Sequence, residues 1–397
     1  MQKINVYGLG YIGLPTASLL ATKGYDVLGI DISKKVVDMI NKAQVHIVEP
    51  DLDILVKSAV NSNKLQASLK PQDADVHIIA VPTPFKEGYQ PDLSYVESAI
   101  KTLCDVLKNK DLVILESTSP VGTTEFIHDV IKELRPKLTE VYIAHSPERV
   151  IPGRVLLELV ENDRVIGGIN QASTEKALEF YQSFVKGKVL ATNARTAEMT
   201  KLTENSFRDV NIAFANELSL ICHKLDIDVW ELIRLANHHP RVNILQPGPG
   251  VGGHCIAVDP WFIVSAAPKE AKLIKKAREV NDYKPQWVIN QVIKQADKYK
   301  SPVVACLGAS FKADIDDLRE SPSLSIIKQI QDKLSSRVIV VEPNIDQLEG
   351  IELVDLDNAL KQADIILVLV DHKEFKNLDK SMILDKCVID AKGIFAL

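Results

Sequence analysis

The chain has 397 residues, of which 46% are hydrophobic and 25% charged, with a formal net charge of -6. Its apolar content is enough for two or three globular domains, and it has no general basic field that would attract nucleic acid, so a negative substrate must meet a few placed cations. The longest apolar runs are far shorter than a membrane span, which argues against membrane insertion and predicts a cytoplasmic protein.

The cysteines indicate neither a disulfide framework nor a structural zinc site. There are five of them, an odd number, and no two form a Cys-x-x-Cys pair. This usage fits a reducing compartment, and no metal is expected.

The N-terminal stretch carries a dinucleotide-binding fingerprint. Residues 4–8 have a strand pattern, and a second strand pattern ends in Asp31. Between them, GxGxxG spacing is formed by Gly8, Gly10 and Gly13. These glycines allow a tight turn, close approach of the backbone to a pyrophosphate, and packing of a helix on a strand. Asp31 suits ribose hydroxyls and repels a 2′-phosphate, so NAD is the predicted cofactor. Lys34 and Lys35 either soften the preference for NAD over NADP or are solvated charges at the start of a helix.

Four more apolar runs continue the strand-helix rhythm. They cover residues 75–84, 111–122, 140–150 and 163–168. Near-continuous Val, Ile and Leu runs predict strands that are buried on both faces of a parallel sheet. Ligands of such sheets bind at the carboxyl ends of the strands. We therefore expect a cluster of polar residues there: Thr83, Thr118, Ser119, Glu148 and Arg149.

The region from about residue 196 to residue 298 has a helical pattern and few β-branched runs. Within it, Lys201, Asn205 and Arg208 stand at i, i+4 and i+7 and so share one helix face. Such charges usually form a solvated face. Apolar residues crowd the same helix, however, so these polar groups are candidates for a pocket.

A loop rich in glycine and proline, residues 239–262, surrounds Cys255 with the sequence HPRVNILQPGPGVGGHCIAVDPWF. Glycine permits left-handed backbone and close approach to a ligand, while proline stiffens the chain. A glycine-rich loop that leads into a helix N-terminus favours a thiolate, so Cys255 is the candidate nucleophile. His254 can help orient the thiol. Asp259 faces the same pocket if the turn after Cys255 is helical.

A second α/β region follows a long helix, expected over residues 271–300 with a kink at Pro285. Its strand patterns are residues 303–308, 338–344, 364–370 and 387–390. Only Gly308 marks its first turn, so it is a poorer dinucleotide binder, but its strand ends can hold another nucleotide, for instance one attached to the substrate. The first connection carries Lys312 and Arg319, either as phosphate contacts or as charges of a surface loop.

A nicotinamide site and a nucleophilic cysteine together predict a two-step oxidation. Hydride loss converts an alcohol to an aldehyde; a thiolate adds to the aldehyde, and a second hydride loss gives a thioester that water hydrolyses to an acid. The base is Lys201, Asp259 or Glu148, and the sequence does not decide among them. Asn205 can hold a water molecule or the alkoxide.

Motifs spread over most of the chain resemble those of the nucleotide-sugar 6-dehydrogenases, the family of UDP-glucose and GDP-mannose dehydrogenases. In family order they read GLGYIGLPTA, VPTP, ESTSPVG, SPERV, TKLTENSFRDVNIAFANE, GPGVGGHCIAVDPW and SFKADIDDLRESPS. The resemblance implies an α/β protein with two Rossmann-like doubly wound domains, joined by a central helical dimerisation domain and a long helix. We predict their boundaries as residues 1–195 for NAD, 196–298 for the centre and 299–397 for the UDP-sugar.

The resemblance also implies roles for individual residues. The catalytic set would be Cys255 as nucleophile and Lys201 as proton donor or acceptor, with Asn205, Asp259, Thr118 and Glu148. NAD would contact Gly8, Gly10, Tyr11, Ile12, Gly13, Asp31, Thr83, Thr118 and Arg319. The nucleotide sugar would contact Arg149, Val150, Lys201, Asn205, Arg208, His239, Arg241, Gly252, Phe311 and Lys312.

Within the family, the loop around Cys255 looks most like that of enzymes acting on UDP-N-acetyl-D-mannosamine, whose uronic acid enters surface polysaccharides. That sugar is the implied substrate, with UDP-N-acetylglucosamine and UDP-glucose as rivals. A homodimer or higher oligomer is implied, with His239 and Arg241 reaching a neighbouring subunit's site. Two positions depart from the family: Lys392 stands nearest to an expected C-terminal arginine, and Lys34 or Lys35 replaces an arginine after the ribose acid.

Two alternatives belong to other classes of protein. A β-hydroxyacid dehydrogenase also pairs a Rossmann domain with a helical domain, and it carries a lysine and an asparagine one helical turn apart, but it performs one oxidation without a thiol. A catalytically silent NAD-binding or nucleotide-sugar-binding regulator is disfavoured because the predicted nucleophile and its helpers are all present.

Overall fold

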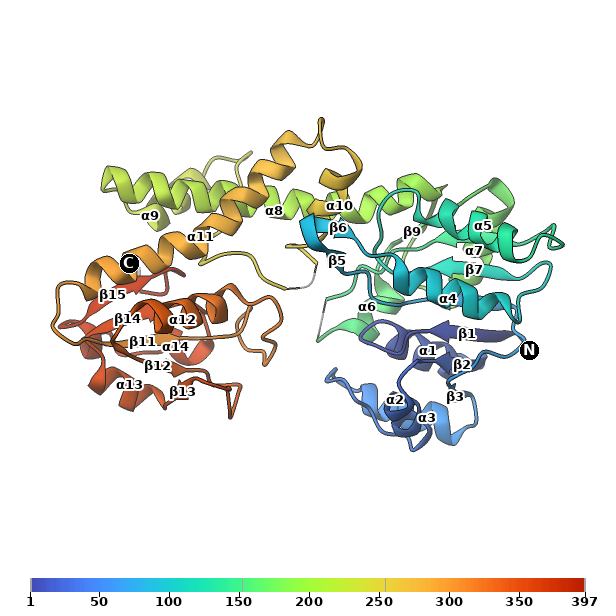
Figure 1. Ribbon diagram of the computed structural model, residues 1–397, viewed down its shortest axis with the longest axis horizontal. Helices are drawn as coiled ribbons and strands as arrows, with labels where there is room; N and C mark the ends of the chain where they lie inside the picture. The colour runs from blue at the N-terminus through green and yellow to red at the C-terminus, as the bar shows by residue number, and fades with distance from the viewer. Residues whose placement is uncertain (1, 152, 254, 396–397) are drawn as a thin grey trace. The chain divides into compact units, whose positions relative to one another are not determined.

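The computed structural model describes residues 2–151, 153–253 and 255–395. The chain divides into two compact units, Met1–Glu204 and Asn205–Leu397. Both are built around a β-sheet with flanking helices, which Figure 1 shows for each unit. None of the helices in the described part of the chain combines the length and apolar character needed to cross a bilayer.

The N-terminal unit contains an eight-stranded sheet with the order β10-β9-β8-β7-β4-β1-β2-β3. Its strands are β1 (Lys3–Tyr7), β2 (Asp26–Ile30), β3 (Leu65–Ser68), β4 (Val76–Ile79), β7 (Leu112–Leu115), β8 (Tyr142–His145), β9 (Arg164–Gly168) and β10 (Val189–Asn193). Chain order reverses between β4 and β1, at the centre of the sheet. This is the switch point at which α/β sheets of this kind bind ligands.

The predicted all-parallel arrangement of this sheet is wrong at one place. β9 pairs with β8 in the antiparallel direction, with Ala144 opposite Gly168 and His145 opposite Gly167. β10 is parallel to β9, so both strands run against the rest. As a result, the first residue of β9, Arg164, lies at the edge where β8 ends and where the predicted ligand residues begin.

Helices cover both faces of this sheet, which confirms the doubly wound prediction. One apolar core contains residues of α1 (Gly13–Thr22), α2 (Lys34–Asn41), α3 (Leu52–Asn61), α6 (Val155–Glu161) and α7 (Gln171–Gln182). The opposite core contains residues of α4 (Ser94–Cys104) and α5 (Thr123–Leu134). A small antiparallel hairpin, β5 (Phe85–Lys86) and β6 (Gln90–Pro91), flanks the short 3-10 helix η1 (Glu87–Tyr89).

Long helices follow, as the pattern of the middle region predicts. α8 (Ala194–Leu225) is continuous across the boundary between the two units, and α9 (Val229–Ala236) follows it. α10 (Asp259–Ala266) begins just after the cysteine loop, and α11 (Lys272–Ala296) contains Pro285. The long helix expected before the second α/β region is therefore present.

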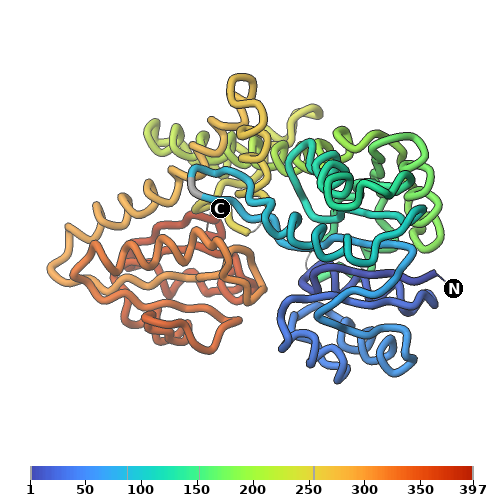
Figure 2. The backbone as a smooth tube through the Cα atoms, turned by 45° about the vertical axis from the view of Figure 1, so that its right-hand side comes forward, coloured from blue at the N-terminus to red at the C-terminus, as the bar shows by residue number. Residues whose placement is uncertain are grey.

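The C-terminal unit contains a five-stranded parallel sheet with the order β13-β12-β11-β14-β15. Its elements are β11 (Val303–Leu307), α12 (Pro322–Lys333), β12 (Arg337–Val341), β13 (Glu352–Leu353), α13 (Leu356–Gln362), β14 (Ile365–Val368), α14 (Lys373–Lys376), the 3-10 helix η2 (Lys380–Ile383) and β15 (Cys387–Asp390). α11 and α12 pack on one face and α13 and α14 on the other (Figure 2). Alternate residues of β11 enter the two cores, which explains why its sequence is apolar throughout.

Candidate active site

The three glycines of the N-terminal fingerprint meet different surroundings. Gly8 has φ +89°, and a Cβ there would lie 2.7 Å from the carbonyl oxygen of Ala80. A Cβ on Gly13 would lie 1.8 Å from the carbonyl oxygen of Gly8, so only glycine lets α1 start this close to the strand. Among the described residues, no heavy atom lies within 4 Å of a Cβ built on Gly10, so that position leaves backbone open to a ligand.

Asp31 follows β2 and is held by backbone groups. Its carboxylate accepts hydrogen bonds from the N–H of Leu9 at 3.0 Å and the N–H of Ser33 at 2.8 Å. The N-cap residue of α1 is Ile12, whose apolar side chain cannot accept a hydrogen bond from the first turn. The amino end of α1 therefore suits a phosphate, and the acid suits a ribose, as an NAD cradle requires.

The predicted cluster at the strand ends is partly assembled by direct bonds. The Thr83 hydroxyl, after β4, donates to the carbonyl oxygen of Thr118, after β7, at 2.5 Å. The Ser117 hydroxyl donates to the carbonyl oxygen of Val81 at 2.7 Å. These bonds tie the ends of two neighbouring strands together beside the fingerprint.

Glu148 belongs to a buried charge network that the sequence did not reveal. Its Oε2 accepts from Nη2 of Arg164 at 2.8 Å, and its Oε1 accepts from the N–H of Arg149 at 2.7 Å. Arg164 is only 4% exposed, and its Nη1 lies 4.0 Å from Oε1 of Glu116. The Tyr181 hydroxyl donates to the same oxygen at 2.7 Å. Glu148 is thus oriented by a charge-assisted bond rather than left to rotate.

The carboxyl group of Glu116 titrates in an unusual range. Burial raises its pKa to about 7, although the positive charge of Arg164 opposes the shift and the nearby Glu148 adds to it. Thr16, on α1, donates to its other oxygen at 3.4 Å. The network therefore connects the helix of the fingerprint to the strand end that carries Glu148.

The first turns of α8 are anchored to the N-terminal unit. Glu198 accepts hydrogen bonds from the N–H groups of Gly122 at 2.6 Å and Thr124 at 2.7 Å, and from the Thr124 hydroxyl at 2.6 Å. It thereby caps the amino end of α5. Lys201, three residues further along α8, is 9% exposed. Glu198 was also missed, because its partners lie more than 70 residues away in the sequence.

Arg149 and Val150, which follow Glu148, have different surroundings. The guanidinium of Arg149 forms an ion pair with Glu204, with Nη2 2.9 Å from Oε1 and Nε 3.1 Å from Oε2. Val150 packs against the apolar core of the sheet. Arg149 therefore has a carboxylate partner within its own unit.

In the C-terminal unit, the turn after Cys255 is helical. The N–H of Asp259 donates to the carbonyl oxygen of Cys255 at 2.9 Å, the i+4 bond of an α-helical turn. Cys255 is exposed and Asp259 is 3% exposed. The carboxylate of Asp259 accepts from Nδ2 of Asn205 at 2.5 Å. Two predicted catalytic side chains thus meet one turn after the thiol, whereas His254 lies outside the described residues.

The glycines before Cys255 lie against the first connection of the C-terminal sheet. A Cβ on Gly252 would meet the carbonyl oxygen of Glu320 at 2.6 Å and Cβ of Phe311 at 2.9 Å. Gly253 has φ +82°, and its Cβ would lie 3.0 Å from the Phe311 ring. The two predicted substrate residues Gly252 and Phe311 are therefore in contact, and Phe311 packs against the two glycines that precede His254 and Cys255.

The remaining predicted residues of this unit lie on its surface. Arg208 on α8 and both His239 and Arg241 are exposed. His239 and Arg241 lie in the segment between Asn237 and Ile244. The side chain of Asn237 accepts a hydrogen bond from the N–H of Ile244 at 2.7 Å and donates one to its carbonyl oxygen at 3.0 Å. These two bonds hold the ends of the segment together.

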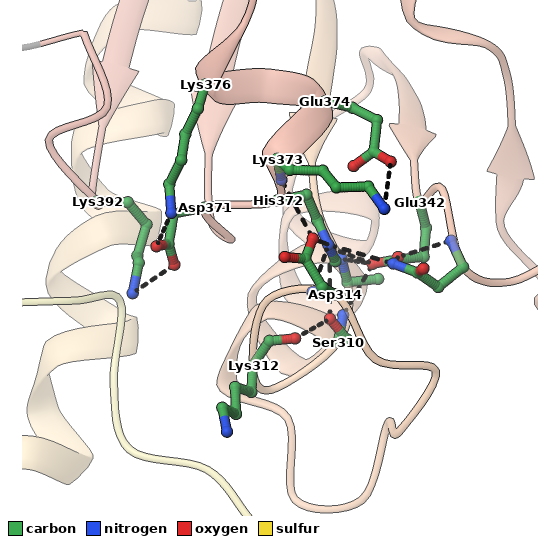
Figure 3. A network of polar contacts seen from close by, with 12 residues as sticks. Ser310, Lys312, Asp314, Glu342, Asp371, His372, Lys373, Glu374, Lys376 and Lys392 are labelled. Carbon is green, nitrogen blue, oxygen red and sulfur yellow. Dashed lines mark hydrogen bonds and ion pairs between the residues drawn. The ribbon is translucent and has the colours of Figure 1, made fainter. Parts of the chain in front are cut away.

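The cations of the C-terminal sheet differ in their partners. Lys312 is exposed, and Arg319 pairs with Asp317 in the same connection, with Nη2 2.6 Å from Oδ2. Lys392 lies 3.1 Å from Oδ1 of Asp371, whose other oxygen pairs with Lys376 at 2.8 Å, as Figure 3 shows. Lys392, at the position of the expected arginine, is thus ion-paired to the residue that precedes His372.

Three family models match consecutive parts of the chain. They describe the NAD binding domain, the central domain and the UDP binding domain of the UDP-glucose/GDP-mannose dehydrogenase family, at residues 2–185, 195–283 and 305–396. The chain belongs to this family. Membership confirms the resemblance seen in the motifs and makes the protein an NAD-dependent oxidoreductase with a domain for the UDP moiety of its substrate.

Individual relatives in the family are similar over nearly their whole length. A UDP-N-acetyl-D-mannosamine dehydrogenase of Campylobacter jejuni is 56% identical over 97% of this chain and 99% of that protein. An NDP-N-acetyl-D-galactosaminuronic acid dehydrogenase of Ralstonia nicotianae is 55% identical over 100% of this chain and 96% of that protein. The solved structure of a UDP-D-ManNAc dehydrogenase from Pyrococcus horikoshii is 40% identical, with TM-score 0.91, over 99% of this chain and 96% of that one.

Family membership decides between the classes of protein that the sequence left open. A β-hydroxyacid dehydrogenase would not match a UDP binding domain over residues 305–396. The residue roles and the three domain boundaries given above stay predictions. In the UDP-glucose/GDP-mannose dehydrogenase family, as here, the fold supplies two sheets, one for each nucleotide.

Proposed function

We propose that this enzyme oxidises the C6 alcohol of UDP-N-acetyl-D-mannosamine to the carboxylate. One sugar, two NAD+ and one water give one uronate, two NADH and three protons. The observation that carries the proposal is the helical turn at Cys255, which leaves the thiol exposed and sets the Asn205–Asp259 pair one turn away. A single oxidation to an aldehyde would need no such thiol.

The thiol divides the oxidation into steps that balance. The alcohol loses a hydride and a proton, and the sulfur of Cys255 adds to the aldehyde carbon to form a thiohemiacetal. Loss of a second hydride and proton gives a thioester, and water cleaves the C–S bond to release the acid and the thiol. Each tetrahedral intermediate develops negative charge on oxygen, which the amide of Asn205 and the ammonium of Lys201 can stabilise.

Two different groups are suited to the proton transfers. Lys201 is mostly buried and stands one helical turn before Asn205 on α8, so we assign it the transfer of the alcohol proton. Glu148 is fixed by Arg164 and offers a carboxylate that can orient the hydrolytic water. The buried Asp259 holds Asn205 in place. This division assigns a separate role to each of the three candidate bases.

The described residues fit NAD. The open backbone at Gly10, the uncapped first turn of α1 and the backbone-held Asp31 match the pyrophosphate and ribose of a dinucleotide. When bound, NAD accepts the hydride in each oxidation. The protein's part is to bind and orient it, and we assign this role to Tyr11, Ile12, Thr83, Thr118 and Arg319.

The identity of the sugar rests on the relatives. The similar proteins named above act on N-acetylated sugars, a mannosamine in two cases and a galactosaminuronic acid in the third. We choose UDP-N-acetyl-D-mannosamine because the loop around Cys255 also resembles that of enzymes for this sugar. Arg149, Val150, Arg208, Gly252, Phe311 and Lys312 are the proposed contacts.

We further propose a homodimer through α8. This helix exposes Phe207, Phe214 and Ile221 at intervals of seven residues, with exposed fractions of 71%, 51% and 46%. Side chains at that spacing lie on one side of a helix and form the seam of helix pairs. A second copy is the occupant that suits an apolar seam on a helix of 32 residues. His239 and Arg241 would then serve the partner's site.

NADH release across a panel of nucleotide sugars tests the proposal. The panel contains UDP-N-acetyl-D-mannosamine, UDP-N-acetylgalactosamine, UDP-N-acetylglucosamine, UDP-glucose and GDP-mannose. We expect the highest kcat/KM with the first and two NADH for each acid formed. One NADH with an aldehyde product would refute the thioester route, and a higher kcat/KM for another sugar would replace the substrate. The Cys255→Ala variant is the matched control and should form no acid.

A further inference from the structure

The two sheets of the protein place an acidic residue at the same point. In the N-terminal unit, Leu9, just after Gly8, donates its N–H to Asp31. In the C-terminal unit, Ala309, just after Gly308, donates its N–H to Glu342 at 2.7 Å. In both units, the second residue after the acid also donates its N–H to it. Glu342 is therefore the counterpart of the ribose-binding acid.

The surroundings of the two acids differ. Asp31 is partly exposed, whereas the side chain of Glu342 is 0% exposed and lies 3.2 Å from Nε2 of His372, itself 0% exposed. Burial acts to raise the pKa of Glu342, but hydrogen bonds from His372 and from the N–H groups of Ala309 and Ser310 lower it to about 2. The carboxylate is thus satisfied inside the protein and unavailable to a ribose.

His372 stands where the N-terminal unit has Thr83. Tyr7 pairs with Ile79 on β4, and Leu307 pairs with Val368 on β14. Thr83 and His372 each follow those strand residues by four positions. The position that carries a predicted cofactor contact in one unit thus carries, in the other, a ring that turns inward onto the acid (Figure 3).

The second nitrogen of the ring holds a loop. Nδ1 of His372 accepts from the N–H of Asp314 at 3.0 Å and lies 3.2 Å from the amide nitrogen of Asn344. The backbone N–H of Asp314 can only donate, so Nδ1 is the acceptor in that bond and Nε2 carries the proton that bonds to Glu342; the carboxylate of Asp314 lies further from Nδ1, at 3.7 Å. Asp314, His372 and Glu374 have potential metal-ligating atoms within 4.8 Å of one another. The lone pair on Nδ1 of His372 already accepts the N–H of Asp314, however, so we interpret these residues as a hydrogen-bond network and not as a metal site.

The loop held in this way is residues 310–314. Its first residue, Ser310, donates its N–H to Glu342 at 3.1 Å and its hydroxyl to the carbonyl oxygen of Lys312 at 2.8 Å. Its last residue is fixed by His372. Between them stands Phe311, which touches Gly252 and Gly253 before the thiol. Figure 3 shows Lys312 extending from this loop on the side away from Glu342.

We propose that His372 is a positioning residue for the nucleotide of the substrate. Together with Glu342, it fixes both ends of the 310–314 loop. The loop then presents Phe311 and Lys312 to the UDP moiety and supports the glycines that precede Cys255. Glu342, the counterpart of the acid that binds ribose in an NAD site, thus stabilises the loop through buried hydrogen bonds. This inference rests on the proposed function only in taking UDP as the nucleotide.

The test compares His372→Ala, His372→Gln and Phe375→Leu. Phe375 is 0% exposed and packs edge-on against the His372 ring at 5.3 Å, but it does not contact the loop through a polar bond, so it controls for loss of core packing. UDP itself is the probe, by titration calorimetry, because its binding does not depend on which sugar is the substrate. Thermal unfolding of each variant shows that it is folded.

We expect His372→Ala to weaken UDP binding about tenfold or more, because the loop loses the ring's hydrogen bonds to Glu342 and to the N–H of Asp314, and to raise KM for the UDP-sugar similarly. KM for NAD should change less than KM for the UDP-sugar, because the cradle at Asp31 belongs to the other unit and only Arg319 of this unit is assigned to NAD. His372→Gln should recover part of the affinity, since its amide can donate to Glu342.

Two results would overturn the positioning role. One is unchanged UDP affinity in folded His372→Ala protein; the other is an equal loss in Phe375→Leu protein of the same Tm, which would mean that general packing, not the hydrogen bonds, supports the site. Failure of the wild type to oxidise UDP-N-acetyl-D-mannosamine while it binds UDP would refute the proposed substrate and leave this test intact.

Discussion

The amide of Asn205 donates to the carboxylate of Asp259 across 54 residues of sequence, at 2.5 Å. Asp259 is almost fully buried at the start of α10, while Asn205 lies on α8. The bond fixes which end of the amide faces outward: Nδ2 is engaged by the carboxylate, which leaves the carbonyl end and the second amide hydrogen for a ligand. The thiol one turn earlier is thus placed relative to an oriented polar group.

Replacement of Asp259 by asparagine should reduce turnover without unfolding the protein. The new side chain has the same shape, but it carries no charge and can rotate its amide toward Asn205, which then loses its fixed orientation. We expect kcat to fall about 10²- to 10³-fold, as when one oriented group of an active site is removed. Steady-state NADH formation measures it. Alkylation of Cys255 by iodoacetamide should continue at a similar rate; a collapse of that rate would mean that the turn itself had been lost.

A matched pair of glycine variants should separate folding from cofactor binding. Gly10→Ala places a methyl group in open space, so the protein should fold normally, but the methyl group should obstruct the pyrophosphate and weaken NAD binding about tenfold or more. Gly13→Ala forces a Cβ to within 1.8 Å of a carbonyl oxygen and should lower Tm markedly. Calorimetry with NAD and thermal unfolding report the two effects. Normal NAD affinity in Gly10→Ala protein would contradict the cradle.

Local patterns were sufficient for the parts of this site that lie close together in the sequence. GxGxxG spacing between two apolar strands, and Cys255 four residues before Asp259, each specify a geometry that a few residues determine. Strand direction is different, because Val, Ile and Gly in β9 are equally compatible with either orientation. The antiparallel pairing of β9, and with it the approach of Arg164 to Glu148, therefore escaped prediction.

Exposure and distance account for the other omissions. β10 was missed because it is an edge strand with no fully buried residue, so its sequence VLATN lacks an apolar run. Glu198 and Glu342 look like ordinary surface acids, and only the folded chain brings the N–H donors that hold them. A repeat of the first fingerprint in the second sheet, Gly308 followed by an acid after the next strand, was the available signal for Glu342.

The buried Glu116 should make stability fall as pH rises. Its pKa is about 7 in the folded protein and near the ordinary 4.5 when unfolded, so between these values the folded state binds more protons. The free energy of unfolding therefore decreases from about pH 4.5 to about pH 7 and levels off above that range. Glu116→Gln cannot ionise, so its stability relative to the wild type should improve over the same interval.

Urea unfolding at pH 5 and pH 8 measures the Glu116 effect. The control is Glu349→Gln, an exposed position whose stability difference from the wild type should not vary with pH. A Glu116→Gln difference that is equally independent of pH would show that the carboxyl is ionised throughout.

Replacement of Arg164 by methionine should destabilise the protein by about 3–5 kcal/mol, because two buried carboxyl groups lose their cation.

A charge on the apolar seam of α8 should dissociate the proposed dimer. Phe214 stands at the middle of the seam and is 51% exposed, so Phe214→Glu costs little in the isolated chain but places a carboxylate in an apolar interface. We expect sedimentation to give a smaller species than the wild type at the same concentration. Leu384→Glu, at a residue 82% exposed on the C-terminal sheet domain, should leave the assembly unchanged.

Because His239 and Arg241 are proposed to serve the partner's site, the Phe214→Glu protein should also show a raised KM for the UDP-sugar while NAD binding persists. If the wild type is a monomer, the predictions of dissociation and of a raised KM are both wrong. If the Phe214→Glu protein dissociates but keeps its KM for the UDP-sugar, each subunit completes its own site.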